Sequence, residues 1–359
     1  MPKPKLLIVH GMGQHTEASF KGEFVNGCEW AFNLYSNYAG KSPEEYVEII
    51  PVAYNDIFDD FRETLADRSA PAATRLQAIP DMSGALLTKA ITALADFESE
   101  IDDDEFFKTH WLDVFLYRFT LLGELVRIRV GRKIADAIGT VYGGPQNVHI
   151  MAHSLGTAVV HDTLSQLYNP DYTLGDIGHL SDVMHKFGSL HLVANTSRVL
   201  ESIVKPSQSV VKPGTNGCTH YYREYRHKLD PVTWPKPFDP KNNGNWISRY
   251  RWESRKYALV KPDSVTNEHG NTHNIRHYLA DPLVHREIFE RIFDLQLTDE
   301  QKTEGQQNYA DATLSDVAED LKDALAELED LDLDSINGVA MAALKLKTFV
   351  EQLGGQYNA

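Results

Sequence analysis

The stretch that decides the fold reads Val148-His149-Ile150-Met151-Ala152-His153-Ser154-Leu155-Gly156-Thr157. Its apolar run, the following serine and the apolar residues up to Tyr168 predict a strand, a sharp turn and a helix. In such a turn the residues two before and two after the serine must be small, and Ala152 and Gly156 meet this requirement. The pattern indicates a nucleophile elbow at Ser154. It also places the N–H of Leu155 at a helix N-terminus, where it can face a developing oxyanion.

A loop with two glycines follows the first apolar run of the chain. Residues 5–9 predict a buried parallel strand that ends in His10-Gly11-Met12-Gly13. Acyl transfer needs a second N–H donor from a neighbouring strand-to-helix loop, and glycine lets this backbone approach closely. We therefore expect the N–H of Met12 to be the second donor of an oxyanion hole. A plain turn or a phosphate-binding loop is the alternative, although the G-x-G-x-x-G and G-K-[ST] patterns are absent from the sequence.

These two motifs resemble those of the α/β-hydrolase superfamily, in particular lipases and esterases with an HG-x-G oxyanion loop and an AHSxG elbow. The resemblance covers residues 5–295 in element order and is specific at the motifs. It implies an α/β-hydrolase fold with a mainly parallel central sheet. In this branch, the residue after His-Gly and the residue after the nucleophile donate the two N–H groups, which correspond to Met12 and Leu155.

The resemblance also implies that an acid and then a histidine follow the serine in the chain. A strand predicted over residues 221–226 is followed by Asp230 and Pro231, and an aspartate at this place is similar to the acid-bearing turn of these hydrolases. Asp230 is therefore the candidate acid, with Asp182 and Glu224 as alternatives.

Four histidines between residues 269 and 285 are candidates for the base: His269, His273, His277 and His285. The segment from Asn271 to Leu279 is similar to the H-x4-Y-L pattern of intracellular relatives, in which the first histidine is catalytic. This similarity favours His273, with His277 as the main alternative.

Alternating helix and strand patterns predict one α/β domain over residues 1–295. Strands are expected at 46–54, 147–152, 189–194, 221–226 and 257–260, and helices at 20–38, 157–168 and 274–295, the last of which could be two helices because of Pro282. Residues 56–140 predict a helical cap insertion, and residues 234–256 a loop insertion whose aromatic residues form either a lid or the insertion's own core. Residues 296–359 predict an acidic helical C-terminal extension.

Composition and charge exclude several classes of protein. The 359 residues carry a formal charge of −16, and 15 acidic but only 4 basic side chains occur from Asp294 onward. This balance argues against binding to a nucleic-acid backbone. Two cysteines cannot form a disulfide framework, and no apolar run reaches the ~18 residues of a membrane span. We expect a cytoplasmic protein. Its acidic extension is either a solvated helix face or a docking surface for a protein partner.

The candidate residues together predict a serine hydrolase that cleaves carboxylic esters, of the esterase or lipase type. Ser154, His273 and Asp230 would form a catalytic triad acting through an acyl-enzyme, with a small-molecule or lipid ester as substrate. No metal-binding motif is present, and neither a metal nor an organic cofactor is expected. Alternatives within enzymes are a phospholipase, a lipid deacylase, a thioesterase or an amidase. The alternative outside enzymes is a non-catalytic, hydrolase-like protein-binding module.

Overall fold

Six strands form one sheet in the computed structural model. The structure describes residues 2–11, 15–59, 113–114, 116–118, 122–198, 209–233, 237–238, 240, 256–265 and 271–313. The strands are β1 (Lys5–Val9), β2 (Glu48–Val52), β3 (Val148–His153), β4 (Phe187–Val193), β5 (Thr219–Tyr225) and β6 (Tyr257–Val260). Their order in the sheet is β2-β1-β3-β4-β5-β6, and every neighbouring pair is parallel. The expected α/β class with a parallel sheet is confirmed.

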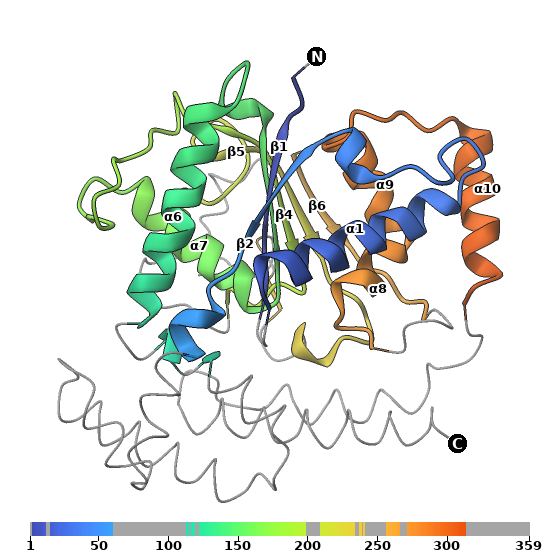
Figure 1. The fold of residues 1–359 in the computed structure, drawn as a ribbon, viewed down its shortest axis with the longest axis horizontal. Coiled ribbons are helices and arrows are strands. Elements are labelled where there is room, and N and C mark those ends of the chain that lie inside the picture. Colours follow the sequence, from blue (N-terminus) through green and yellow to red (C-terminus); the bar gives the residue numbers. More distant parts are fainter. Residues whose placement is uncertain are drawn as a thin grey trace, which may run out of the picture.

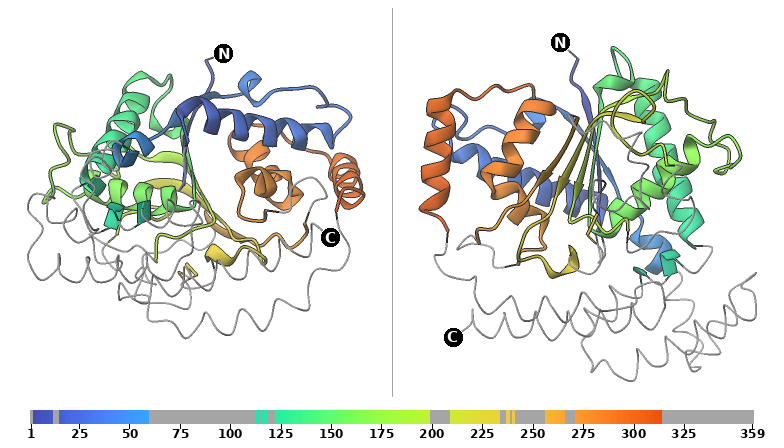
Figure 2. Two further views of the ribbon diagram at one scale, coloured as in Figure 1. Left: turned by 60° about the horizontal axis from the view of Figure 1, so that its bottom comes forward. Right: turned by 180° about the vertical axis from the view of Figure 1, so that it is seen from behind.

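Helices cover both faces of this sheet (Figure 1). One face carries α6 (Leu122–Thr140) and α7 (Leu155–Leu167). The other carries α1 (Glu17–Asn33), α8 (Ile275–Ala280) and α9 (Pro282–Arg291), with α10 (Asp299–Ala310) on its outer side. Figure 2 shows the same three layers from two further directions. Short 3-10 turns at Pro43–Glu45, Pro145–Asn147 and Pro231–Thr233 complete the described elements.

The burial of β1 on both faces explains why its sequence is an uninterrupted apolar run. Leu7 and Val9 belong to the core under α6 and α7. Leu6 and Ile8 belong to the second core, under α1, α8 and α9. A parallel strand with helices on both sides has no solvent-facing residues, so the period-2 alternation of polar and apolar residues disappears.

The strand order reverses direction at β1, and this reversal positions the site. The chain runs from β1 to β2 on one side, then crosses to β3 on the other side of β1. In open α/β sheets the loops on either side of such a reversal diverge, which leaves a crevice at the carboxyl ends of the strands. The loops that follow β1 and β3 therefore meet at the same edge of the sheet.

The region expected to be helical over 274–295 forms two helices. Asp281 lies between them and caps α9, because its side chain accepts a hydrogen bond from the N–H of Leu283. Pro282 occupies the first turn of α9, where its missing N–H costs nothing. The chain expected to form the cap insertion is described only at its ends, including α6. Most of the loop insertion and residues 314–359 of the acidic extension lie outside the described residues.

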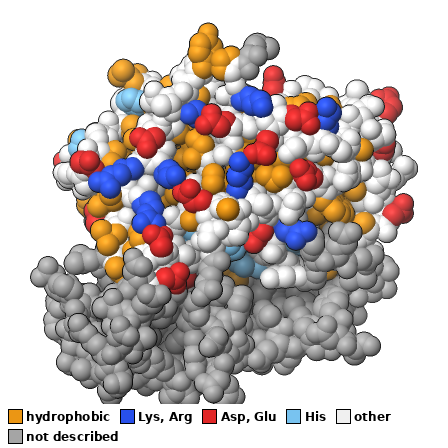
Figure 3. Space-filling view, viewed as in Figure 1, with side chains coloured by type: hydrophobic (Ala, Val, Ile, Leu, Met, Phe, Trp, Pro, Cys, Tyr) orange, Lys and Arg blue, Asp and Glu red, His pale blue; other side chains and the backbone are white. Residues whose placement is uncertain are grey.

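Charged side chains of both signs alternate on the face seen in Figure 3, without a large basic patch. None of the helices that the structure describes is long and apolar enough to cross a bilayer.

The first helix of the C-terminal extension packs on the α/β domain. Tyr309 is buried, and its hydroxyl lies 3.2 Å from Oδ2 of Asp281. The Asn308 side chain donates to the carbonyl of Leu34 at 2.8 Å. A Cβ atom added at Gly305 would lie 2.5 Å from Cζ of Tyr35, so the glycine lets α10 pack against this buried ring, which follows α1 in the chain.

Gly305→Ala should therefore destabilise the protein, although alanine usually stabilises a helix. We expect the free energy of unfolding to fall by about 1–3 kcal/mol through overpacking. The matched control is Gly22→Ala in α1, where an added Cβ has open space, and it should raise stability by about 0.5–1 kcal/mol. Urea denaturation measures both changes, and a stabilising Gly305→Ala would disprove the packing of α10 on Tyr35.

Buried histidines form a hydrogen-bonded chain across three strands. Ser189 Oγ lies 2.7 Å from Nδ1 of His149 and 2.8 Å from Nε2 of His191, whose Nδ1 lies 2.8 Å from the hydroxyl of Tyr225. Burial lowers the pKa of His149 to about 4 and that of His191 well below 6.5. In α9, burial also lowers the pKa of His285 to about 3.

Acid should therefore destabilise the protein. The pKa values of these histidines in the folded state lie below 6.5, so below that pH the unfolded chain binds more protons than the folded protein does. The free energy of unfolding therefore falls as the pH drops from 6.5 toward 4. Asp281, whose pKa burial raises to about 6, acts in the opposite direction as a single group. Urea denaturation from pH 8 to pH 4.5 measures the slope. In His149→Gln the slope should be smaller by up to about 1.4 kcal/mol per pH unit, and an unchanged slope would contradict the assignment.

Candidate active site

Ser154 occupies a strained turn between β3 and α7. Its backbone angles are φ 54° and ψ −128°, a conformation that residues other than glycine seldom adopt. Its N–H donates to the carbonyl of Val193 at 2.9 Å. Its own carbonyl accepts from the hydroxyls of Thr157 at 2.6 Å and Thr196 at 3.0 Å, and from the N–H of Thr157 at 2.9 Å. These bonds hold the serine in the turn that the sequence predicts.

Two glycines let the loop after β1 reach this turn. A Cβ at Gly156 would clash with the carbonyl oxygen of His10 and lie 2.7 Å from that of Val9. A Cβ at Gly11 would lie 2.5 Å from Cβ of Ser154. The backbones of the two loops are in direct contact, which larger residues at either position would prevent.

His10 fixes the carbonyl of Gly11 beside Ser154. The N–H of Tyr54 donates to Nε2 of His10 at 3.1 Å, so the proton is on Nδ1, which donates to the Gly11 carbonyl at 2.6 Å. Burial, together with the nearby His15, lowers the pKa of His10 to about 3, so this ring is neutral. The Tyr54 hydroxyl also donates to the carbonyls of His10 at 2.8 Å and Gly11 at 3.2 Å. Met12, the expected second N–H donor, lies outside the described residues.

Leu155 is the first residue of α7 and follows the serine directly. The first N–H groups of a helix have no partner within the helix. The Leu155 N–H donates no hydrogen bond to another described residue. This N–H is therefore available as a donor beside Ser154, and its role in an oxyanion hole stays a prediction.

His273 links Ser154 to Asp230. Its Nε2 lies 3.0 Å from Oγ of Ser154, and its Nδ1 lies 3.0 Å from Oδ2 and 3.1 Å from Oδ1 of Asp230. The serine comes from the end of β3, the aspartate from the loop after β5, and the histidine from the loop before α8. The tertiary structure thus brings together the three residues that the sequence selected, which are 119 and 43 residues apart in the two contacting pairs.

Asp230 is a fully buried carboxylate with several partners. Burial opposes its ionisation, but the adjacent His273 and hydrogen bonds from His273 and Tyr278 keep the pKa of its carboxyl below the ordinary value. The Tyr278 hydroxyl donates to Oδ2 at 2.7 Å, and the N–H of Val232 donates to Oδ1 at 3.1 Å. Burial and the charge of Asp230 raise the pKa of Tyr278 well above 10, so this phenol remains a donor.

This arrangement can activate a hydroxyl group. A carboxylate at Nδ1 holds the imidazole with its proton on that nitrogen, which leaves Nε2 free to accept the proton of Ser154. The same carboxylate stabilises the imidazolium that forms.

The structure places the alternative candidates away from Ser154. Nε2 of His277 lies 3.2 Å from the carbonyl of Ser264, and Nε2 of His285 lies 2.6 Å from the hydroxyl of Tyr35. Glu224 accepts from Tyr257 at 2.7 Å, and Asp182 lies before β4 at the amino edge of the sheet. His269 lies outside the described residues.

Two residues that contact Asp230 and His273 were not assigned from the sequence. Tyr278 holds Asp230, and it is the tyrosine of the H-x4-Y-L pattern that begins at His273, so the pattern contained the signal. His153, directly before the serine, contacts the backbone of His273 at 2.6 Å.

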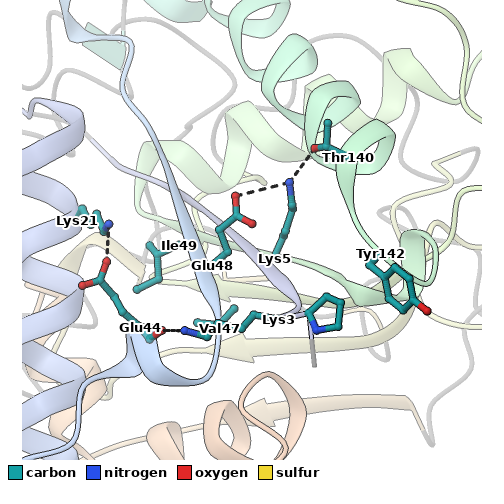
Figure 4. A pocket seen from close by; sticks show the side chains of 10 residues that line it. Lys3, Lys5, Lys21, Glu44, Val47, Glu48, Ile49, Thr140 and Tyr142 are labelled. Carbon is teal, nitrogen blue, oxygen red and sulfur yellow. Dashed lines mark hydrogen bonds and ion pairs between the residues drawn. The ribbon is translucent and has the colours of Figure 1, made fainter.

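A cavity of about 490 Å³ lies at the opposite edge of the sheet, at the amino ends of β1 and β2 (Figure 4). Its lysines have partners within it: Lys5 donates to Thr140 at 2.7 Å, and Lys21 pairs with Glu44 at 2.6 Å. Because Ser154 follows the carboxyl end of β3, this cavity is not part of the site. Among the described residues, no cluster of three or more His, Cys, Asp and Glu side chains is placed to hold a metal ion.

In comparisons with known proteins, no protein-family profile and no curated protein sequence matches this chain.

Tyr278→Phe should destabilise the protein by removing a donor from a buried charge. It also leaves the N–H of His227, which donates to the Tyr278 hydroxyl at 3.0 Å, without this acceptor. We expect the free energy of unfolding to fall by about 2–3 kcal/mol at pH 7. Tyr38→Phe is the control, because the Tyr38 hydroxyl forms no hydrogen bond with the described residues; it should change stability by less than about 0.5 kcal/mol. Equal effects in urea denaturation would show that the Tyr278 hydroxyl does not stabilise Asp230.

Proposed function

We propose that this protein is a serine hydrolase of the α/β-hydrolase type that cleaves carboxylic esters. The observation that carries the proposal is the pair of contacts made by His273, 3.0 Å from Oγ of Ser154 and 3.0 Å from Oδ2 of Asp230. In this proposal the three residues are a catalytic triad.

The assignment to the α/β-hydrolase type is supported by the arrangement around the triad. The chain order is serine, aspartate and histidine, as in that superfamily. The serine lies on a strained strand-to-helix turn with φ 54°, and the His-Gly loop after β1 contacts it. The side chains of Ser154, His273 and Asp230 can carry out the proposed reaction without a metal ion or a bound cofactor.

The proposed reaction has two halves. Ser154 Oγ attacks the carbonyl carbon of the ester while Nε2 of His273 takes its proton, and the carbonyl oxygen becomes an oxyanion. When the tetrahedral intermediate collapses, the bond to the alcohol oxygen breaks and the imidazolium gives its proton to that oxygen. Water then attacks the acyl-enzyme by the same path, which releases the carboxylic acid and returns the proton to Ser154. The sum is one ester and one water converted to one alcohol and one acid.

Two backbone N–H groups are proposed to hold the oxyanion. The N–H of Leu155 is at the start of α7, where the helix dipole also favours negative charge. The N–H of Met12 is the proposed second donor, and the hydrogen bonds of His10 and Tyr54 to the Gly11 carbonyl support this role by fixing the preceding residue. Donors fixed in advance reduce the cost of charge development in the transition state.

The substrate class within esters is open to direct test. Lipid esters, including those of phospholipases and lipid deacylases, and thioesters react by the same chemistry, and a fold does not choose among them. A panel of p-nitrophenyl esters of increasing chain length, thioesters and emulsified lipids would separate these alternatives.

Labelling with a fluorophosphonate probe should modify Ser154, because the probe reacts with a serine whose proton is accepted by a neighbouring base. Intact mass should show one adduct, and peptide mapping should place it on Ser154. Ser154→Ala should remove the adduct, and Asp230→Asn should slow labelling by roughly 10³–10⁴-fold.

Ser209→Ala is the matched control. Its hydroxyl also contacts a histidine, His161, at 3.3 Å, but it lies on no strained turn. Labelling of Ser209→Ala should equal that of the wild type. A folded wild-type protein without an adduct would contradict the proposal and favour the non-catalytic protein-binding module.

A further inference from the structure

His153 lies at the end of β3 and has no role in the proposed reaction. Its Nε2 lies 2.6 Å from the backbone carbonyl oxygen of His273. The two rings lie 4.8 Å apart between centroids, at an angle of 41°. Only 8% of the His153 surface is exposed. The residue next to the nucleophile therefore contacts the backbone of the base.

The direction of this hydrogen bond follows from the charge state of the ring. Burial, followed by the nearby His273, lowers the pKa of His153 to about 3, so the ring is neutral at physiological pH. A carbonyl oxygen only accepts, so Nε2 of His153 carries the proton and donates it. Protonation of His153 is not needed for the contact.

The loop that carries His273, residues 271–274, is neither helix nor strand, and side-chain hydrogen bonds hold it in place. The Thr272 hydroxyl donates to the carbonyl of Leu229 at 2.7 Å, which ties this loop to the loop of Asp230. The side chain of Asn271 accepts from the N–H of His273 at 3.0 Å, and Asn274 caps α8. The contact of His153 adds a tie from the strand that precedes Ser154.

We propose that His153 is a positioning residue that couples the base to the nucleophile. By fixing the carbonyl of His273, it holds the backbone from which the imidazole must span Ser154 and Asp230. This role rests on the proposed function, because a positioned base matters only if Ser154 reacts.

His153 and Ser154 are consecutive, so a shift of the β3 end moves both residues together. A base loop tied to His153 follows that shift, and the 3.0 Å contact between Nε2 of His273 and Oγ of Ser154 is kept. Without the tie, the loop can move relative to the serine, and a misplacement of about 1 Å can cost roughly 10²-fold in rate.

Three variants of His153 separate the hydrogen bond from the shape of the ring. His153→Phe keeps a flat ring but removes the donor. His153→Gln places an amide N–H near the position of Nε2. His153→Asn keeps a polar side chain that is too short to reach the carbonyl, and it serves as a second loss-of-contact variant if the phenylalanine variant does not fold.

His149→Phe is the matched control. His149 lies four residues earlier in β3, is also buried, and contacts Ser189 rather than the site. The same substitution at this position therefore tests for general damage to the strand.

Two measurements report on the wild type and these variants. The first is turnover of p-nitrophenyl butyrate together with the rate of fluorophosphonate labelling. His153→Phe and His153→Asn should lower kcat and the labelling rate by about tenfold to a hundredfold with KM nearly unchanged, and His153→Gln should recover most of the loss. The second is hydrogen exchange of residues 271–280, which should be faster in the Phe and Asn variants than in the wild type, His153→Gln and His149→Phe.

The outcomes separate the positioning role from the proposed function. Faster exchange in the loss-of-contact variants of a protein that neither turns over esters nor labels would support the tie and refute the hydrolase. Normal wild-type activity with unchanged rates and exchange in His153→Phe and His153→Asn would refute the tie and leave the hydrolase standing. Equal losses in His153→Gln and His153→Phe, or in His149→Phe and His153→Phe, would also overturn the positioning role.

Discussion

The contact between two backbones, at Gly156 and His10, is the constraint on which the site depends. The start of α7 packs so closely on the loop after β1 that a side chain at Gly156 would clash with the His10 carbonyl. This proximity follows from the parallel pairing of β1 and β3, in which Val9 is level with Ala152. A small residue is therefore required at position 156, directly after the strained turn at Ser154.

A buried carboxylate is the second constraint. A charge without solvent must have hydrogen-bond donors, or it becomes protonated. Asp230 has three donors: the backbone N–H of Val232, the imidazole of His273 and the hydroxyl of Tyr278. The last two come from one segment, the loop before α8 and α8 itself. The need to compensate one charge thus fixes the position of α8 and, with it, the direction of the His273 ring.

Much of the fold was predictable because its signals are local. The apolar run at Lys5–Val9 and the strand at Tyr257–Val260 have the bounds that the sequence indicates. Other strand ends differ by one or two residues: β2 is shorter than expected at both ends, whereas pairing with β4 extends β3 to His153. Pro282 indicated a break in the last long helical segment, and α9 begins at this proline. Apart from α6 and the other described ends of the cap region, the elements of the cap, the loop insertion and the end of the acidic extension stay predictions.

The sequence by itself determined the α/β class and the place of Ser154, because small residues, apolar runs and turn residues act over a few positions. It also narrowed the partners of the serine to a few acids and histidines. Only the tertiary structure decided which of these meet. His273 and His277 lie four residues apart, yet one contacts Ser154 and the other the carbonyl of Ser264. The H-x4-Y-L similarity favoured His273, but the contact itself depends on where the sheet, α8 and the loop after β5 lie in space, because it joins residues 119 positions apart in the chain.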